Sequence, residues 1–469
     1  MKIDSEVIQM EISKILQTSQ EVKFGKVLKF ILPTYLTSLF NTLYTIIDGI
    51  YVSRYVSTNS LAAINTVYPL VNIMTGIALA FATGGSALAA IAVGAGDRKK
   101  ADSAFSVSII SSILIGSLFS IIVLINLTPV LKFLGATPVT MTDCRIYGFL
   151  WLAAAPAVIG KELFTYFIRA DGSPRWSFSI ALSGGIFNIV LDQLFVAQLN
   201  MGIFGAGLAT ALGLVLSCAI GILYFAIYRK NLRFTIRHLP FTCGIRCMVN
   251  GLSECIDQLA IAVTTIVFNR TALMLAGENG IAAVSIIMYL QFLFIGVYFG
   301  YSMGISPLLG YALGNHKPEI CRKLEQYSYR FFAAAPLMIY GLTYICAPFA
   351  VTFFAEKQSL VFNLALSGMR LYGISFLFSG FNIFAAVRLT SYGKGHYSGI
   401  ITFLRSFALL LVFLIILPHF FGISGMWLAV PAAEAATFGV SLLSVKKSVF
   451  KVIICMDKNR FSAASQTQR

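Results

Sequence analysis

The sequence predicts an all-α integral membrane protein with twelve transmembrane helices in two six-helix lobes that are related by an internal repeat. Of its 469 residues, 58% are hydrophobic and only 12% are charged, whereas soluble domains contain about 25% charged residues. The mean hydropathy is +0.82. Twelve apolar windows can be placed, each near the length of about 20 residues that a membrane-spanning helix needs.

The apolar windows fall into two sets of six. They cover residues 24–52, 61–83, 103–127, 146–168, 176–197, 201–227, 248–276, 281–303, 327–350, 363–387, 398–420 and 422–446. We expect a cytoplasmic N-terminal segment (1–23), an N-lobe (24–228), a cytoplasmic linker (229–246), a C-lobe (247–446) and a cytoplasmic tail (447–469). The N-terminal segment is polar and lacks the apolar core of a cleaved signal peptide, so we expect none.

The two sets repeat each other with an offset of about 220 residues. Gly94 returns as Gly314, and Gly202-Ile-Phe-Gly205 returns as Gly422-Ile-Ser-Gly425. Each half contains an even number of spans, so both halves have the same orientation and should be related by an axis along the membrane normal. The acids do not repeat, because Asp48 corresponds to Phe268. The halves therefore share packing but not ion chemistry.

The formal net charge of +16 reflects topology. Most of the 35 Lys and Arg fall in the N-terminal segment, the tail and every second loop, whereas the alternate loops hold only Arg54, Lys132, Arg145 and Lys357. This bias predicts a multi-pass protein of the plasma membrane with both termini in the cytoplasm. The basic residues form no compact domain, which argues against nucleic-acid binding, and they suit contact with anionic lipids.

No pattern of nucleophilic or metal-binding residues predicts an enzyme. The eight cysteines show no paired framework, and Cys243 and Cys247, near His238, lack a second ligand pair for zinc. No His-Glu-x-x-His motif and no phosphate-binding Gly-x4-Gly-Lys-[Ser/Thr] loop occurs. We therefore expect no catalytic residues, no metal centre and no cofactor.

The N-lobe contains the deepest acid of the chain. Asp192 is the only ionisable residue of the apolar run 179–196, and Asn188 lies one helical turn earlier on the same face. A carboxylate in the hydrocarbon region is costly and should face the bundle interior or a wet cavity. Asn188 and Thr210 could donate hydrogen bonds to it. Asp48 follows Tyr44 by one turn and has an alternative interpretation, as the start of a loop at the outer interface.

The C-lobe places its acids elsewhere. Glu254 and Asp257 lie one turn apart, early in the seventh predicted span, where either an ion-coupling role or a structural, water-facing role is open. Arg405 and Glu434, in the last two spans, could neutralise each other, although sequence alone cannot show the contact.

Over residues 24 to 446 the chain resembles the multidrug and toxic compound extrusion (MATE) antiporters, bacterial branch. The motifs that carry the resemblance are Pro33 with Asp48, Gly94-Ala-Gly96, Arg169-Ala-Asp-Gly172, Asn188-Ile-Val-Leu-Asp192, Gly202-Ile-Phe-Gly-Ala206, and Gly422-Ile-Ser-Gly-Met-Trp427 with Pro431 and Glu434. The resemblance implies two lobes that open alternately and export organic cations in exchange for H⁺ or Na⁺.

The resemblance also implies functional residues. Asp48, Asn188 and Asp192 would hold the coupling ion, with Tyr44 and Thr210 nearby. Some branches use an acid at the position of Glu254, so Glu254 with Asp257 forms a possible second coupling site. Because both sets are present, the coupling route stays open at this point.

The buried acids and the absent nucleotide motif favour a secondary exporter of small organic cations, working as a monomer among membrane lipids. A flippase for lipid-linked saccharides, of a related fold, is the alternative. It should carry more cationic side chains in the central spans, to bind a pyrophosphate. A channel is disfavoured because no re-entrant filter-like segment is found.

Overall fold

The structure is a computed structural model that describes residues 22–56, 58–236, 239–352 and 356–466. Most of the predicted N-terminal segment and His238 lie outside the described residues. Within the described ranges, every regular element is a helix.

The first half of the chain forms α2 (Phe24–Tyr55), α3 (Thr58–Gly94), α4 (Arg98–Ile125), α5 (Leu127–Phe133), α6 (Met141–Ala153), α7 (Ala155–Ala170), α8 (Pro174–Asp192), the π-helix Gln193–Gln198, α9 (Gly202–Leu223) and the π-helix Tyr224–Tyr228.

The second half forms α10 (Phe241–Asn250), α11 (Leu252–Gly314), α12 (Pro318–Thr352), α13 (Leu360–Tyr372), the 3-10 turn Gly373–Ser375, α14 (Phe376–Ser391), α15 (Gly395–Phe403), the π-helix Leu404–Ala408 and α16 (Leu409–Gln466). Two of these helices contain a sharp turn at a glycine with positive φ: α11 at Gly277 (61°) and α16 at Gly422 (55°).

The helices account for the predicted spans. In the described part of the chain, nine helices are long and apolar enough to cross a membrane, or ten if α6 and α7, which are bent by 53°, form one span. One of the nine, Gly395–Leu443, contains the turn at Gly422 and therefore makes two spans. The 32-residue helix α2 supplies a further span. This arrangement is consistent with the prediction of twelve.

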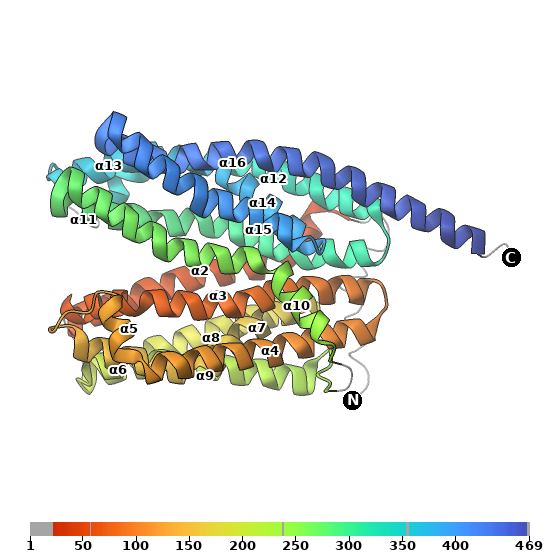
Figure 1. Ribbon diagram of the computed structural model, residues 1–469, viewed down its shortest axis with the longest axis horizontal. Coiled ribbons are helices and arrows are strands. Elements are labelled where there is room, and N and C mark those ends of the chain that lie inside the picture. The colour runs from red at the N-terminus through yellow and green to blue at the C-terminus, as the bar shows by residue number, and fades with distance from the viewer. Residues whose placement is uncertain (1–21, 57, 237–238, 353–355, 467–469) are drawn as a thin grey trace.

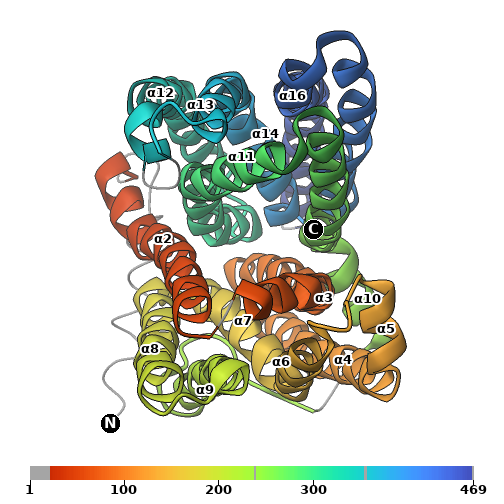
Figure 2. The same cartoon turned by 90° about the vertical axis from the view of Figure 1, so that its left-hand side faces the viewer.

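The helices form two groups that lie side by side (Figure 1). Seen end-on, α3 to α9 make one group and α11 to α16 the other (Figure 2). The two described chain ends and α10 lie at one end of the bundle, here called the linker end. The opposite end carries α5, α6 and α13 (Figure 1).

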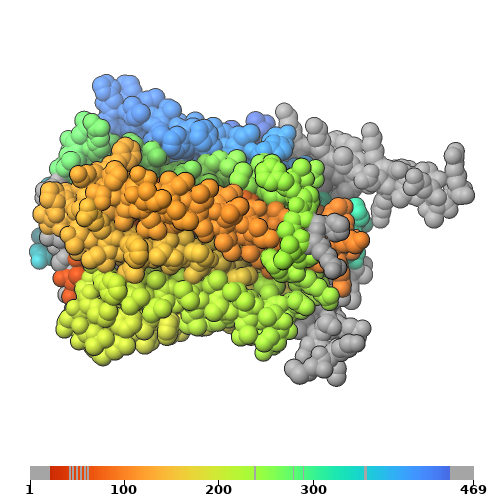
Figure 3. Space-filling model, turned by 60° about the horizontal axis from the view of Figure 1, so that its bottom comes forward, coloured from red at the N-terminus to blue at the C-terminus, as the bar shows by residue number. Residues whose placement is uncertain are grey.

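The outside of the bundle is apolar, as contact with lipid requires. Leu114 on α4 is 67% exposed, Ile345 on α12 is 75% exposed and Ile415 on α16 is 69% exposed. One outer face shows α4 and α9 running along the molecule while α10 crosses its linker end (Figure 3). Large exposed aliphatic side chains on this scale mark a membrane-facing surface.

The repeat is visible in how the two halves touch. A Cβ atom on Gly94 would lie 2.1 Å from the carbonyl oxygen of Tyr311, and one on Gly314 would lie 1.8 Å from the carbonyl oxygen of Ile91. These two contacts are repeat counterparts, because Gly94 corresponds to Gly314 and Ile91 to Tyr311. The two contacts are consistent with the predicted internal repeat, and only glycine fits where α3 and α11 cross.

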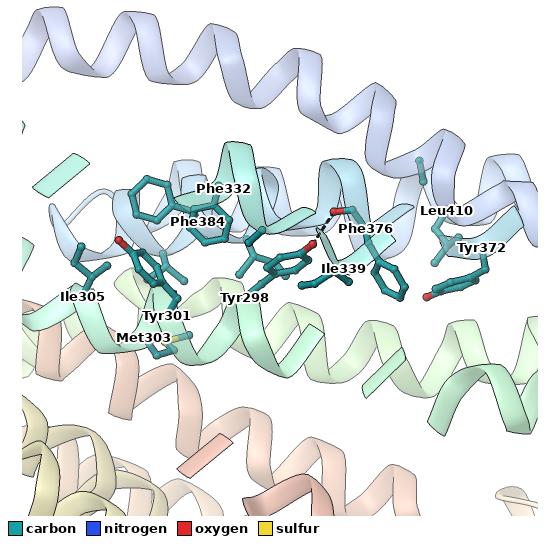
Figure 4. Packing of buried hydrophobic residues seen from close by; sticks show 14 of the residues in the cluster. Tyr298, Tyr301, Met303, Ile305, Phe332, Ile339, Tyr372, Phe376, Phe384 and Leu410 are labelled. Atoms are coloured by element: carbon teal, nitrogen blue, oxygen red, sulfur yellow. Dashed lines mark hydrogen bonds between the residues drawn. The ribbon is translucent and has the colours of Figure 1, made fainter. Parts of the chain in front are cut away.

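The first span of the chain crosses from one lobe core into the other, and α10 packs against the N-lobe core. Ile31, early in α2, belongs to the aromatic C-lobe core that Figure 4 shows, in which Tyr298 donates a 3.0 Å hydrogen bond to the carbonyl of Phe376. Val52, late in α2, belongs to the N-lobe core. Likewise Cys247 of α10 joins the N-lobe core, although Phe268 of α11 joins the C-lobe core. The predicted lobe boundaries stay predictions.

The linker is held against the N-lobe by one buried carboxylate. Asp171, between α7 and α8, accepts hydrogen bonds from the backbone N–H groups of Lys230 (2.9 Å), Asn231 (2.6 Å) and Leu232 (2.9 Å). The Tyr224 hydroxyl donates a fourth, at 2.7 Å. A family motif thus has a structural role at this position, as the anchor of the linker.

Candidate ion-coupling sites

Two adjacent glycines fix α8 between its neighbours. A Cβ atom on Gly184 would lie 1.9 Å from the Ser217 hydroxyl of α9, and one on Gly185 would lie 2.4 Å from the Phe40 ring of α2. Absence of side chains therefore brings three helices together one to two turns before Asp192. Tyr44 also packs at this contact, with ring carbon Cδ1 3.5 Å from the same Gly185 position.

The two N-lobe acids meet at this helix contact. Asp192, the last residue of α8, is fully buried, and Asp48 of α2 is half-buried. The two carboxyl groups are close enough to interact electrostatically. Two ionised carboxylates repel each other and can only accept hydrogen bonds, so a proton or a cation between them would relieve the repulsion. Asp48 lies within a helix that continues to Tyr55, so the loop-start interpretation is wrong.

Asn188 and Thr210 are brought together, but not in the predicted way. Asn188 Nδ2 donates to Thr210 Oγ1 at 3.5 Å, and Thr210 donates to the Ala206 carbonyl at 3.0 Å. Both carboxylate oxygens of Asp192 and Oδ1 of Asn188 are buried without a hydrogen-bond donor. The expectation that Asn188 and Thr210 donate to Asp192 is therefore wrong, because each donates elsewhere.

The chemistry of these oxygens suits a proton or a hard cation. Carboxylate and amide oxygens are the ligands that such cations prefer. The π-helix Gln193–Gln198 begins directly after Asp192, and π-helical turns are frequent at functional sites. It is tied to α2 by Tyr51, whose hydroxyl donates to Gln193 Oε1 at 3.0 Å.

Sequence reasoning missed one neighbour of the acid pair. Tyr147 of α6 is buried and lies within electrostatic range of Asp48 and Tyr44. Its span contains no motif that marks this residue, and an isolated tyrosine in an apolar helix has no distinguishing pattern.

The C-lobe acids are arranged differently. Asp257 Oδ1 lies 2.9 Å from Arg405 Nη2, and Glu434 Oε1 lies 3.3 Å from Arg405 Nη1. The suspected neutralisation of Glu434 by Arg405 is confirmed, and Asp257 shares the same guanidinium. Both C-lobe candidates, Glu254 and Asp257, lie in the first turns of α11 at the linker end. Asp48 lies in the last turns of α2, so the two sets are not brought together.

Glu254 lies where the two halves meet. It lines two small cavities, one of which is shared with Tyr166 and Arg169 of α7 and with Ser306 of α11. The other cavity is also lined by Asp257 and Arg405. Among the ion pairs of the described residues, none includes Glu254.

Comparison with known proteins shows which family has this architecture. The MatE family model matches the chain twice, over residues 33–194 and 255–416. The multidrug export protein MepA of Staphylococcus haemolyticus is 24% identical over 423 residues, which are 88% of this chain and 90% of that protein. MepA of Staphylococcus aureus strain MRSA252 is 23% identical over 443 residues, 90% of this chain and 93% of that protein.

Solved structures share the fold. A crystal structure of MATE in complex with MaL6 superposes with a TM-score of 0.88 at 21% identity, covering 94% of this chain and 99% of that chain. The outward-facing conformation of a multidrug resistance MATE family transporter of the MOP superfamily gives a TM-score of 0.85 at 23% identity, covering 91% and 96%.

Proposed function

Because the chain belongs to the MatE family, we propose that it is a secondary active efflux transporter that exports organic, mostly cationic, compounds in exchange for H⁺ or Na⁺. The observation that carries the proposal is the N-lobe acid pair Asp48–Asp192, in which Asp192 is fully buried and neither of its carboxylate oxygens has a hydrogen-bond donor. The MepA relatives, described as multidrug export proteins, support the substrate class.

The proposed mechanism is alternating access. The close glycine contacts between α3 and α11 hold the halves together toward the linker end, which we place in the cytoplasm with both termini. A proton or sodium ion that enters between Asp48 and Asp192 removes their mutual repulsion and changes the balance between the two open states. The ion drives export only if it binds these states with different affinity.

The assigned ion-site residues are Asp48, Asn188 and Asp192, with Tyr44 and Thr210 beside them. Transport by conformational exchange involves no covalent step, and we assign no catalytic residue and no cofactor beyond the coupling ion. We place the protein in the plasma membrane as a monomer, with lipid around its apolar surface.

The alternative, a flippase for lipid-linked saccharides, would need buried cations available to a pyrophosphate. Of the four buried cations among the described residues, three are neutralised: Lys161 by Glu162 at 2.6 Å, Arg388 by Glu325, and Arg405 by two acids. The fourth, Arg169, has no acid partner among these ion pairs; it donates to the Thr165 carbonyl at 3.1 Å and stacks on the Tyr166 ring at 4.1 Å. This pairing favours the exporter.

The test is efflux of a fluorescent organic cation from proteoliposomes that contain the purified protein. A proton gradient and a sodium gradient are imposed separately, at matched membrane potential. We expect one of them to accelerate efflux, whereas liposomes with neither gradient should show only leakage. Efflux that neither gradient accelerates, in protein that binds the dye, would refute the proposal.

A further inference from the structure

One guanidinium contacts two acids of the C-lobe. Arg405 is 9% exposed and contacts Asp257 of α11 at 2.9 Å and Glu434 of α16 at 3.3 Å. It lies in the π-helix Leu404–Ala408, so that three elements converge on one cation. A buried cation between two carboxylates gives each acid a positively charged partner without any ion from solution, and the three groups together keep one negative charge.

Neutral donors also reach this cluster. Ser406 donates at 2.5 Å to Asp257 Oδ1, the oxygen that contacts Arg405, and Asn382 Nδ2 donates to Glu434 Oε2 at 2.7 Å. Ser441 in turn donates to Asn382 Oδ1 at 2.8 Å. The C-lobe acids therefore differ from Asp192, whose two oxygens have no donor.

The repeat shows why the N-lobe has no such cation. With the offset of about 220 residues, Arg405 corresponds to the Gly184–Gly185 pair. The space beside Gly185 is filled by Phe40 of α2, whose ring would lie 2.4 Å from an added Cβ atom. A long side chain cannot enter there, so the N-lobe acids lack the tethered partner that the C-lobe acids have.

We propose that Arg405 is a built-in cation that fills the acid site of the C-lobe and thereby confines binding of the coupling ion to the N-lobe. Arg405 then determines which lobe binds the coupling ion, because its guanidinium competes with that ion for Asp257 and Glu434. The inference deepens the proposed function and rests on it for the role of the N-lobe. The predicted second site at Glu254 and Asp257 loses Asp257 to this contact.

The same geometry predicts what removal of the guanidinium would create. Carboxylate oxygens of Asp257 and Glu434, with the Ser406 hydroxyl, would then face one another, and Na⁺ prefers such oxygen ligands. A small cavity lined by Asp257 and Arg405 already reaches the cluster and gives an ion a place to enter. Arg405→Met keeps an unbranched, flexible side chain but removes the guanidinium and its charge.

The experiment measures ²²Na⁺ binding to purified full-length protein in which the N-lobe acids are neutralised, as Asp48→Asn with Asp192→Asn. We expect no saturable Na⁺ binding in this background. Adding Arg405→Met should restore saturable binding of one Na⁺ per protein, and adding Glu434→Gln as well should abolish it again. NaCl should also raise the thermal unfolding temperature of the Arg405→Met protein above that in choline chloride, since a bound ion stabilises the fold.

The matched control is Arg370→Met in the same background. Arg370 is another C-lobe arginine, but it stacks on the Tyr344 ring at 4.7 Å, so its loss should create no Na⁺ site. A folded Arg405→Met protein without Na⁺ binding would show that Arg405 only staples three helices together, and would overturn the inference.

If Arg405→Met fails to fold, the protein with only Asp48→Asn and Asp192→Asn still tests the inference. Residual Na⁺ or H⁺ binding that Glu434→Gln removes would overturn the inference, and its absence would support it. These binding measurements need no transport. Failure of the efflux assay would therefore count against the proposed function without affecting the result for Arg405.

Discussion

At the residue scale, pairing distinguishes the acids of the two lobes. Asp192 is fully buried and faces another acid, whereas Glu434 faces an arginine and an amide. A buried carboxylate without a basic partner is costly to keep charged. A proton or cation that binds such a group removes this cost. Ion coupling requires an acid whose neutralisation changes the energy of the protein in this way.

We predict that Asp192→Asn uncouples transport. The amide imitates a permanently neutral side chain, so the protein should fold and bind some substrate while gradient-driven efflux falls by about 5- to 150-fold, the usual range of coupling between sites. Glu254→Gln should leave most of the gradient effect. Both variants are measured by proteoliposome efflux, with substrate binding followed across pH.

The controls for this pair are expression level and monodispersity of each purified variant. Should Glu254→Gln alone abolish gradient-driven efflux, coupling would run through the C-lobe instead. Full coupling in well-folded Asp192→Asn would likewise contradict the N-lobe assignment.

At the element scale, the crossing of α3 and α11 brings the two halves so close that only glycine fits at Gly94 and Gly314. We predict that Gly94→Ala and Gly314→Ala both separate the linker ends, because each new Cβ atom would lie within about 2 Å of a carbonyl oxygen. Spin labels at Lys100 and Glu319, in a cysteine-free background, should report a longer distance. The two variants should act alike, since they are repeat counterparts.

Gly341→Ala is the matched control, because a Cβ atom there meets nothing within 4 Å. An unchanged label distance in both interface variants, with transport intact, would show that α3 and α11 adapt without moving the halves.

The linker anchor leads to a further prediction. Asp171→Asn replaces an acceptor oxygen by a donor facing the backbone N–H groups of residues 230–232, and each buried group left unsatisfied costs about 1–3 kcal/mol. We expect a lower unfolding temperature and faster tryptic cleavage at Arg229 and Arg233. Asp97→Asn, at an exposed helix start, serves as the control. Equal cleavage of the two variants would contradict the anchor role.

Helices and their repeat were predictable because lipid imposes long apolar runs and because duplication leaves glycines at matching positions. The acid pair was predictable as two candidates, since charges in apolar runs stand out. The contact of Arg405 with Asp257 was not predictable, because the two residues are far apart in the sequence and no local pattern links them. The crossing of α2 into the C-lobe core was equally hidden, as lipid-facing and core-facing apolar residues look alike.

At the scale of the whole molecule, the distribution of basic residues predicts orientation. We expect Lys100→Cys to react with a membrane-impermeant thiol reagent only from the cytoplasm, and Lys357→Cys only from outside, because they lie at opposite ends of the bundle. Both side chains are exposed, which allows labelling. Reaction of both from the same side of intact cells would rule out the twelve-span arrangement.

The crossing of α2 also has a consequence for biogenesis. Ile31 packs in a core that also contains residues of the second half, such as Phe332 and Phe384, which are translated 301 and 353 residues later. While the ribosome completes the chain, the start of α2 has no protein partner and borders lipid or the insertion machinery. Native packing of the first inserted helix is therefore completed only by the second half. A chain that is truncated at the linker lacks the residues that pack against the start of α2.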